Sequence, residues 1–253
     1  MRQVERRFVQ AAGMAQDSAG AVTIAYWLWP ASDATTADSE RVLALHGLGD
    51  HGWVWAEVAE SLGDSDGSCR SDRFTVIAPD LRGHGDSSKP EAGYDPLAVI
   101  GDLEAVFAQE GWDSAHVVAH SWAAKAAVAW AAQSSGRVRS LTLIDPAFVV
   151  QMPIWTGLTF PLLYRTLSFL KLLQPQASEA KLRSLAQGLK QFEGWSELQE
   201  RVFELGVEEK ADGRWASKFA LQARDGVFAD CLRSSGFSQP WGGDRCCSYL
   251  SGD

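Results

Sequence analysis

The amino-acid sequence predicts an α/β protein built on a mostly parallel, doubly wound sheet. Short apolar runs rich in β-branched residues alternate with stretches of helical periodicity up to about residue 147, which is typical of βαβ units. Turn-forming Gly, Pro and Asp residues follow several of these runs. The chain has 253 residues, of which 46% are hydrophobic, so it is long enough to bury one large core.

Five apolar runs are predicted to be strands. The second of them is short and apolar and ends at His46-Gly47, which indicates a central strand buried on both faces. The third is stopped by Pro79. The predicted strands are Val22–Trp29, Arg41–Leu45, Phe74–Ala78, Ala115–Ala119 and Val138–Ile144.

Helices are predicted between these strands, over Trp53–Leu62, from Asp95-Pro96 onward and over Trp122–Gln133. Asp95 is expected to cap the second helix, and Pro96 suits its first turn, where a missing N–H has no consequence. The polar stretches 32–40 and 63–72 are expected to be surface loops. Four apolar residues of the second helix are expected to share one face: Leu97, Ile100, Leu103 and Phe107.

The pattern changes after the fifth strand. Residues 148–223 show helical periodicity with no convincing strand, which indicates an all-helical insertion in the place of a lid. From Gly226 the tail is expected to be irregular, with Cys246–Leu250 as a candidate last strand. We therefore divide the chain into a core (1–147), a helical lid (148–225) and an incomplete return to the core (226–253).

Charge and composition exclude several classes of partner. The net charge is -9 and no Lys/Arg cluster interrupts it, so neither nucleic acid nor an anionic membrane is expected as a partner. The N-terminus is charged and lacks an apolar signal core, and the apolar stretch 158–173 is broken by Pro161, Arg165 and Lys171. A cytoplasmic protein without a membrane span is therefore expected.

The cysteines indicate neither a disulfide framework nor a metal site. Two of the four are adjacent, and none has the spacing of zinc ligands. They are Cys69, Cys231, Cys246 and Cys247.

A serine stands at the junction between a predicted strand and a predicted helix, in the segment Ala119-His120-Ser121-Trp122-Ala123. A nucleophile elbow places a serine on such a strained turn and exposes its hydroxyl above the sheet. Small residues are needed two positions to either side, and alanine fills both positions here instead of the usual glycine. The alternative is that Ser121 only caps the helix.

A glycine-rich loop, His46-Gly47-Leu48-Gly49, directly follows the central strand. Acyl-transfer enzymes need two backbone N–H donors for the developing oxyanion. The N–H of Trp122, at the start of a helix, and that of Leu48 are the candidates. The alternative is a dinucleotide site, because Gly47-Leu48-Gly49-Asp50-His51-Gly52 also fits G-x-G-x-x-G.

A third segment, Pro79-Asp80-Leu81-Arg82-Gly83-His84-Gly85-Asp86-Ser87, follows the next strand. With the glycine-rich loop before it and the Ser121 elbow after it, residues 20–150 resemble the α/β-hydrolase fold family, and the helical insertion resembles its cap. A dinucleotide-binding protein would explain only one of the three segments.

The resemblance implies a serine hydrolase that acts on a small-molecule acyl substrate and needs no cofactor or metal. Ser121 would attack the acyl carbonyl, Leu48 and Trp122 would form the oxyanion hole, and His46, Gly47 and Gly49 would support that loop. A serine nucleophile argues against dehalogenase or epoxide-hydrolase chemistry, for which the family uses a carboxylate. Esterase, thioesterase or lactonase activity, perhydrolysis and C–C hydrolysis all stay open.

In this family the acid and then the histidine follow the serine, but all five histidines of the chain lie before Ser121. Asp145, at the end of the fifth strand, is the candidate acid, with a structural role as the alternative. His120 is expected to pack in the sheet, and His51 is the histidine best placed to face the site.

We therefore expect the last strands, the histidine loop and the C-terminal helix to be missing and the chain to be incomplete or inactive. The alternative is a non-catalytic fold relative that binds a small apolar ligand. The insertion supplies aromatic residues for such a ligand, or to pack the lid against the core: Phe148, Trp155, Phe160, Tyr164, Phe169, Phe192 and Trp195.

Overall fold

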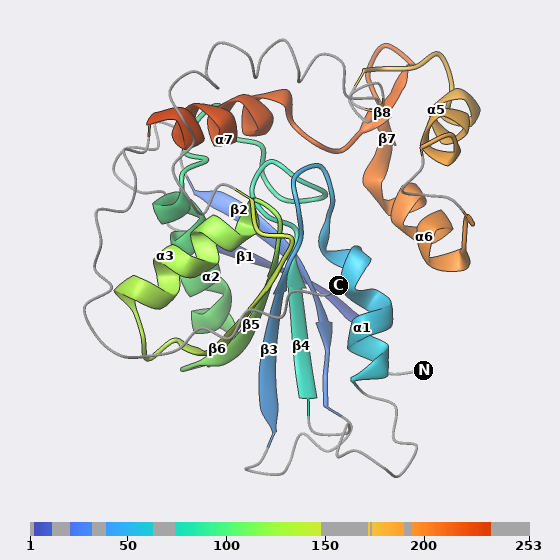
Figure 1. Cartoon of the computed structure of the whole chain (residues 1–253). Helices are drawn as coiled ribbons and strands as arrows, with labels where there is room; N and C mark the ends of the chain where they lie inside the picture. The colour runs from blue at the N-terminus through green and yellow to red at the C-terminus, as the bar shows by residue number, and fades with distance from the viewer. Residues whose placement is uncertain are drawn as a thin grey trace.

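A computed structural model describes residues 3–11, 21–31, 39–62, 74–147, 172, 174–189 and 194–233. Its centre is a six-stranded sheet of order β1-β2-β4-β3-β5-β6 (Figure 1). Strands β4, β3, β5 and β6 are mutually parallel, whereas β1 and β2 run antiparallel to their neighbours. The strands are β1 Glu5–Ala11, β2 Val22–Trp29, β3 Glu40–Leu45, β4 Phe74–Pro79, β5 Ala115–His120 and β6 Val138–Ile144. The predicted mostly parallel sheet is confirmed.

Helices cover both faces of the sheet, as a doubly wound fold requires. The short helices η1 (Gly52–Trp55) and α1 (Ala56–Ser61) lie on one face, and α2 (Pro96–Glu110) and α3 (Ala123–Gln133) lie on the other (Figure 1). Successive residues of β3 alternate between the two layers and are buried in both, which explains why its sequence is a continuous apolar run.

Helix α2 begins where its sequence predicts. The Asp95 carboxylate accepts hydrogen bonds from the N–H groups of Leu97 and Ala98 at 2.9 and 3.2 Å, and Gly111 ends the helix at φ 64°. The prediction that Leu97 shares the buried face is wrong, because its side chain is 48% exposed. Leu97 lies about 120° around the helix from Leu103, the centre of the buried stripe.

The chain after β6 is more varied than predicted. It forms α5 (Glu179–Gln187), α6 (Glu197–Gly206), a two-stranded sheet of β7 (Val207–Glu209) and β8 (Trp215–Ser217), and α7 (Leu221–Arg233). The all-helical prediction is therefore wrong for the hairpin, whose strands are three residues long and too short to show an alternating pattern. The prediction of an irregular tail from Gly226 is also wrong, since α7 continues to Arg233.

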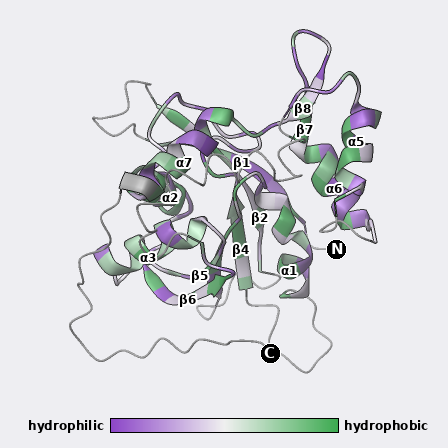
Figure 2. Ribbon diagram, turned by 45° about the horizontal axis from the view of Figure 1, so that its top comes forward, coloured by the Kyte–Doolittle hydropathy of each residue, from purple (hydrophilic) through white to green (hydrophobic). Residues whose placement is uncertain are grey.

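Several predictions for this part lie outside the described residues, namely the helical periodicity of 148–171 and the candidate strand Cys246–Leu250. In the described part, Ser178 caps α5 and Ser196 forms a capping box with Gln199 at the start of α6. A small apolar cluster that includes Leu182 and Phe203 joins the two helices. Figure 2 shows the hydrophobic residues of α5 and α6 and the hydrophilic tip of the β7–β8 hairpin.

The turn that follows β4 ties the sheet to the helices around it. Asp80 is 2% exposed, and its carboxylate accepts hydrogen bonds from the N–H of Gly52 at 2.8 Å and of Asp86 at 2.9 Å and pairs with Arg6 of β1. Although burial would raise its pKa, the Arg6 guanidinium holds the pKa of Asp80 below its usual value. Gly85 is required here, because at φ 51° its Cβ would lie 2.1 Å from Asp80 Oδ2. The segment 79–87, one of the three that carry the family resemblance, thus has a structural role: it holds β1, β4 and η1 together.

Replacing Gly52 with alanine is expected to lower the free energy of unfolding by about 1–3 kcal/mol, measured by urea denaturation. A Cβ at this position would lie 2.3 Å from the carbonyl oxygen of Ala78 in β4, so η1 would have to move off the sheet. Gly101→Ala in α2 is the matched control. Its Cβ would have no neighbour within 4 Å, so alanine should stabilise the helix. Equal stability of Gly52→Ala and the wild type would contradict the close packing.

Candidate functional site

Ser121 occupies a strained turn between β5 and α3. Its backbone is left-handed, with φ 55°, which is unusual for a residue other than glycine. The Ser121 N–H donates to the carbonyl of Ile144 at 3.0 Å, and its own carbonyl accepts from the N–H groups of Ala124 and Ala147, both at 3.1 Å. These bonds fix the turn against the end of β6.

The two alanines that flank Ser121 are fully buried, which explains the need for small residues. Ala119 and Ala123 have no exposed surface, and both belong to the core between the sheet and helices α2 and α3. Ser121 itself is partly exposed. Among the described residues nothing hydrogen-bonds to its hydroxyl, so the hydroxyl is available to a ligand.

The glycine-rich loop lies directly against the Ser121 turn. A Cβ on Gly47 would lie 2.6 Å from the Nδ1 atom of His120 and 3.4 Å from the Cβ of Ser121. The loop then turns sharply, with Gly49 at φ 87° and the Asp50 N–H donating to the Gly47 carbonyl at 3.3 Å. Ser121 and Leu48 are therefore brought to the same end of the sheet.

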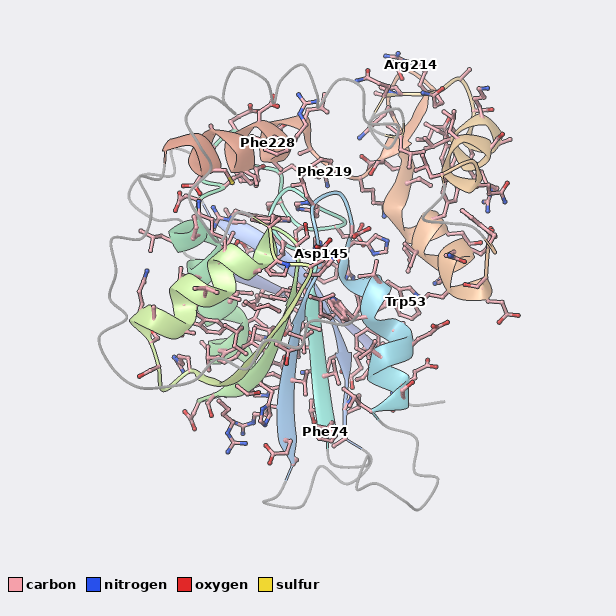
Figure 3. The ribbon with its side chains drawn as sticks, in the orientation of Figure 1. Trp53, Phe74, Asp145, Arg214, Phe219 and Phe228 are labelled. Atoms are coloured by element: carbon pink, nitrogen blue, oxygen red, sulfur yellow. The ribbon has the colours of Figure 1, made fainter. Side chains whose placement is uncertain are left out.

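Asp145 lies at this edge as well. It follows β6 and has a left-handed backbone with φ 43°, and its side chain is exposed. Figure 3 shows Asp145 above the ends of the strands, where the loops gather. Because Ile144 and Ala147 on either side of it bond to the Ser121 backbone, the two residues share one rigid junction.

Two of the histidines near the edge are structural. His46 Nδ1 donates to the carbonyl of Gly47 at 2.8 Å and its Nε2 accepts from the Leu81 N–H at 3.0 Å, while burial lowers its pKa to about 4. His84 is fully buried between His46, Trp122 and Phe219, and burial holds its pKa well below the usual value. Both rings are neutral near pH 7.

The other two histidines near Ser121 differ in their surroundings. His51 is buried, and its Nε2 donates to the carbonyl of Val202 in α6 at 2.8 Å, so this nitrogen holds the later part of the chain against the core. His120 is only partly buried, and its ring lies against Gly47 at the loop. The fifth histidine, His116, lies near the start of β5 and contacts Ser140 and Glu40.

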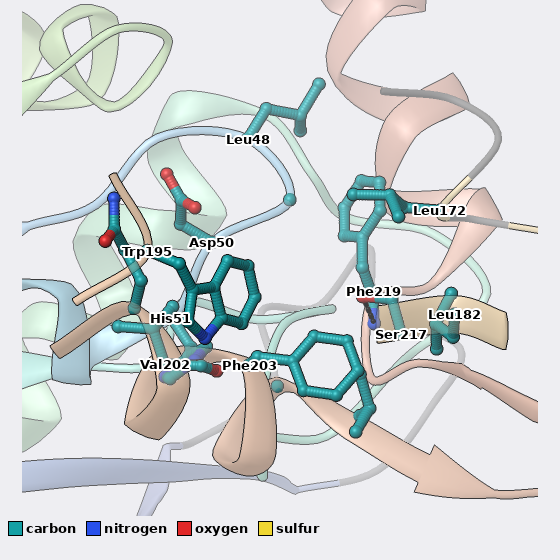
Figure 4. A pocket seen from close by; sticks show the side chains of 14 residues that line it. Leu48, Asp50, His51, Leu172, Leu182, Trp195, Val202, Phe203, Ser217 and Phe219 are labelled. Carbon is teal, nitrogen blue, oxygen red and sulfur yellow. Dashed lines mark hydrogen bonds between the residues drawn. The ribbon is translucent and has the colours of Figure 1, made fainter. Parts of the chain in front are cut away.

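A pocket of about 120 Å³ opens between the glycine-rich loop and the elements after β6 (Figure 4). Leu48, Asp50 and His51 line it on the loop side, and α6 and the segments beside it contribute mostly apolar side chains. Three aromatic rings take part, those of Trp195, Phe203 and Phe219. The arrangement suits a small apolar ligand with its polar end at the loop.

Sequence reasoning found one of these aromatic residues, Trp195, and missed Phe203 and Phe219 as well as Asp50. Burial raises the pKa of the Asp50 carboxyl to about 6. Its position in the G-x-G-x-x-G segment indicated that Asp50 belongs to the glycine-rich loop. That segment alone does not indicate which residues from later in the chain form a pocket around Asp50. The other aromatic residues predicted for the insertion lie outside the described residues.

The described part of the chain has no helix long and apolar enough to cross a membrane. Within the same residues no group of three His, Cys, Asp or Glu side chains is placed to hold a metal ion.

Lys125 and Asp230 join α3 to α7 at 2.5 Å, so α7 is anchored to the core close to the Ser121 turn.

Comparison with known proteins gives consistent matches. The family model described as "alpha/beta hydrolase fold" matches residues 40–234. The chain is 30% identical over 128 residues to a soluble epoxide hydrolase of Corynebacterium sp. (strain C12), which covers 51% of this chain and 41% of that protein. It is 43% identical over 75 residues to 2-(acetamidomethylene)succinate hydrolase of Mesorhizobium japonicum, with 30% of this chain and 27% of that protein covered.

A solved structure of E-2-(acetamidomethylene)succinate hydrolase superposes with a TM-score of 0.67 at 20% identity, covering 90% of this chain and 74% of the other. At that identity the likeness shows the fold. The segments matched in the two curated relatives span well under half of those proteins' own length, 41% and 27%.

Proposed function

Because the chain belongs to the α/β hydrolase fold family, we propose that it is a serine hydrolase that cleaves an ester, thioester or related acyl substrate through Ser121. The observation that carries the proposal is the left-handed Ser121 turn, pressed against Gly47 at the carboxyl edge of the parallel strands. Strain of this kind, about 1–3 kcal/mol per residue, clusters at functional sites. The pocket beside Leu48 would receive the acyl group.

The backbone donors support an oxyanion hole. Among the described residues no acceptor takes a hydrogen bond from the N–H of Leu48 or of Trp122, which are the residues after Gly47 and Ser121. Trp122 also stands at the start of α3, where the helix dipole favours negative charge. Within the described part of the chain, both N–H groups are therefore available to bind the developing oxyanion.

A serine nucleophile needs a general base beside it to accept its proton. No histidine follows Ser121 in the chain, and His46, His51 and His84 are committed to backbone partners. This observation favours a second candidate function, a non-catalytic protein that binds a small apolar ligand in the pocket. Asp145 is the proposed acid, since it shares the Ser121 junction.

Incubation with a fluorophosphonate probe tests the proposal. The wild type is expected to be labelled rapidly and Ser121→Ala not at all, because the probe reacts with an activated serine hydroxyl. Ser184→Ala, which removes an exposed hydroxyl on α5, should label like the wild type. A folded wild type that stays unlabelled would contradict the proposal and leave the ligand-binding function.

A further inference from the structure

Asp50 is the one carboxylate among the described residues that line the pocket, whose other polar side chains are His51, Gln199 and Ser217. Asp50 lies in the turn that begins at Gly47, and Trp195 and Phe203 line the pocket from the α6 side (Figure 4). Leu48, two residues away, lines the same pocket and leads to the Ser121 turn through Gly47. Ser121 is not among the described residues that line the pocket, and the loop from Gly47 to Asp50 connects the pocket to the Ser121 turn.

The charge of Asp50 is not compensated within the described part of the chain. No described residue donates a hydrogen bond or forms an ion pair with its carboxylate. Burial is the cause of its raised pKa, without a contribution from a neighbouring charge. The other titratable side chain that lines the pocket, His51, is neutral at pH 8 because burial lowers its pKa. Asp50 is half-buried and lines the pocket, so its unpaired carboxylate is accessible to a ligand that enters, which points to a role in binding.

We propose that Asp50 selects ligands that carry an ammonium group on an apolar body, by pairing with that ammonium inside the pocket. The aromatic rings of Trp195, Phe203 and Phe219 supply the surface for the apolar body, and such rings also attract cations. Phe203 already contacts one cation, since the Arg183 guanidinium lies 4.5 Å from its ring centroid. The proposal rests on the proposed function only in taking this pocket for the substrate site.

Three ligands with the same apolar body test the proposal by calorimetry: phenylpropylammonium, phenylpropanol and phenylpropionate. The wild type at pH 8 should bind the ammonium about tenfold more tightly than the alcohol, because only the ammonium forms a charge-assisted hydrogen bond with the Asp50 carboxylate. The carboxylate ligand should bind most weakly, because Asp50 repels it. In Asp50→Asn the ammonium and the alcohol should bind with affinities within about twofold of each other. Glu57→Gln removes an exposed carboxylate on α1 and should retain the tenfold preference.

Ser121→Ala should also retain the preference for the ammonium, so a failure of the proposed acyl chemistry would leave this result unchanged. Equal affinities in the wild type, no binding of any of the three ligands, or a preference that survives Asp50→Asn would each overturn the proposal. The melting temperature gives a second measurement without ligand. Asp50→Asn should raise it at pH 8, whereas a fall would mean that the carboxylate is already paired within the protein, and would also overturn the proposal.

Discussion

Lowering the pH from about 7 to about 4 is expected to reduce the free energy of unfolding by about 3 kcal/mol through His46 alone. Burial lowers the pKa of this ring from 6.5 to about 4, so the unfolded chain takes up its proton before the folded protein does. The stabilisation is therefore complete above the unfolded value and is lost as the pH falls through this window. His51 and His84 act in the same direction, because burial also lowers their pKa values.

Asp50 opposes this trend, which decides how the experiment is arranged. Its pKa is raised to about 6, so the folded protein holds this proton more tightly and gains stability as the pH falls from about 6 to 3.8. Urea denaturation over this pH range is best done on Asp50→Asn, because this variant removes the opposing contribution of Asp50 and leaves that of the buried histidines. His84→Phe in that background should flatten the dependence. A free energy of unfolding that stays constant from pH 7 to pH 4 would show that the rings are not buried as neutral groups.

Asp102→Ala is expected to lower the free energy of unfolding by about 3–5 kcal/mol, because it leaves a buried guanidinium without its partner. Arg82 is 1% exposed and donates through Nε and a terminal nitrogen to the two oxygens of Asp102, at 2.6 and 2.7 Å. A third hydrogen bond runs from Arg82 to the carbonyl of Gly93 at 2.6 Å. The pair thus joins the turn after β4 to helix α2, and chemical denaturation measures its loss.

Two further variants distinguish an unpaired charge from simple loss of packing. Arg82→Met combined with Asp102→Leu removes both charges and should recover most of the stability lost in Asp102→Ala. Glu204→Ala breaks an ion pair with Arg201 whose side chains are 51% and 44% exposed, and it should cost less than about 1 kcal/mol. If Glu204→Ala and Asp102→Ala had equal effects, the buried pair would have no special role.

The elements that the sequence predicted well depend on local chemistry. The Ser121 turn follows from a strand, a helix and two small residues within a few positions, and the cap of α2 depends only on Asp95 and Pro96. Strand β3 could be identified because both of its faces are buried, which leaves a continuous apolar run.

The elements that were missed depend on distant partners. Strand β1 was not predicted because its Glu5-Arg6-Arg7 start does not look like a strand. Its charges are satisfied by residues far along the chain, Arg6 by Asp80 and Arg7 by Glu110. Asp50 was missed for the same reason, since its isolation arises only when Trp195 and Phe203 close over the loop.

The left-handed backbone at Ser121 implies that selection for stability alone would not place a serine at this position. At φ 55° a residue with a Cβ is disfavoured, whereas glycine adopts this conformation readily. Nothing described hydrogen-bonds to the Ser121 hydroxyl, so the fold gains no contact in return for the strain. A stabilising redesign of this chain would therefore place glycine at position 121. Such a redesign should nevertheless keep Ser121, because glycine there would remove the proposed nucleophile.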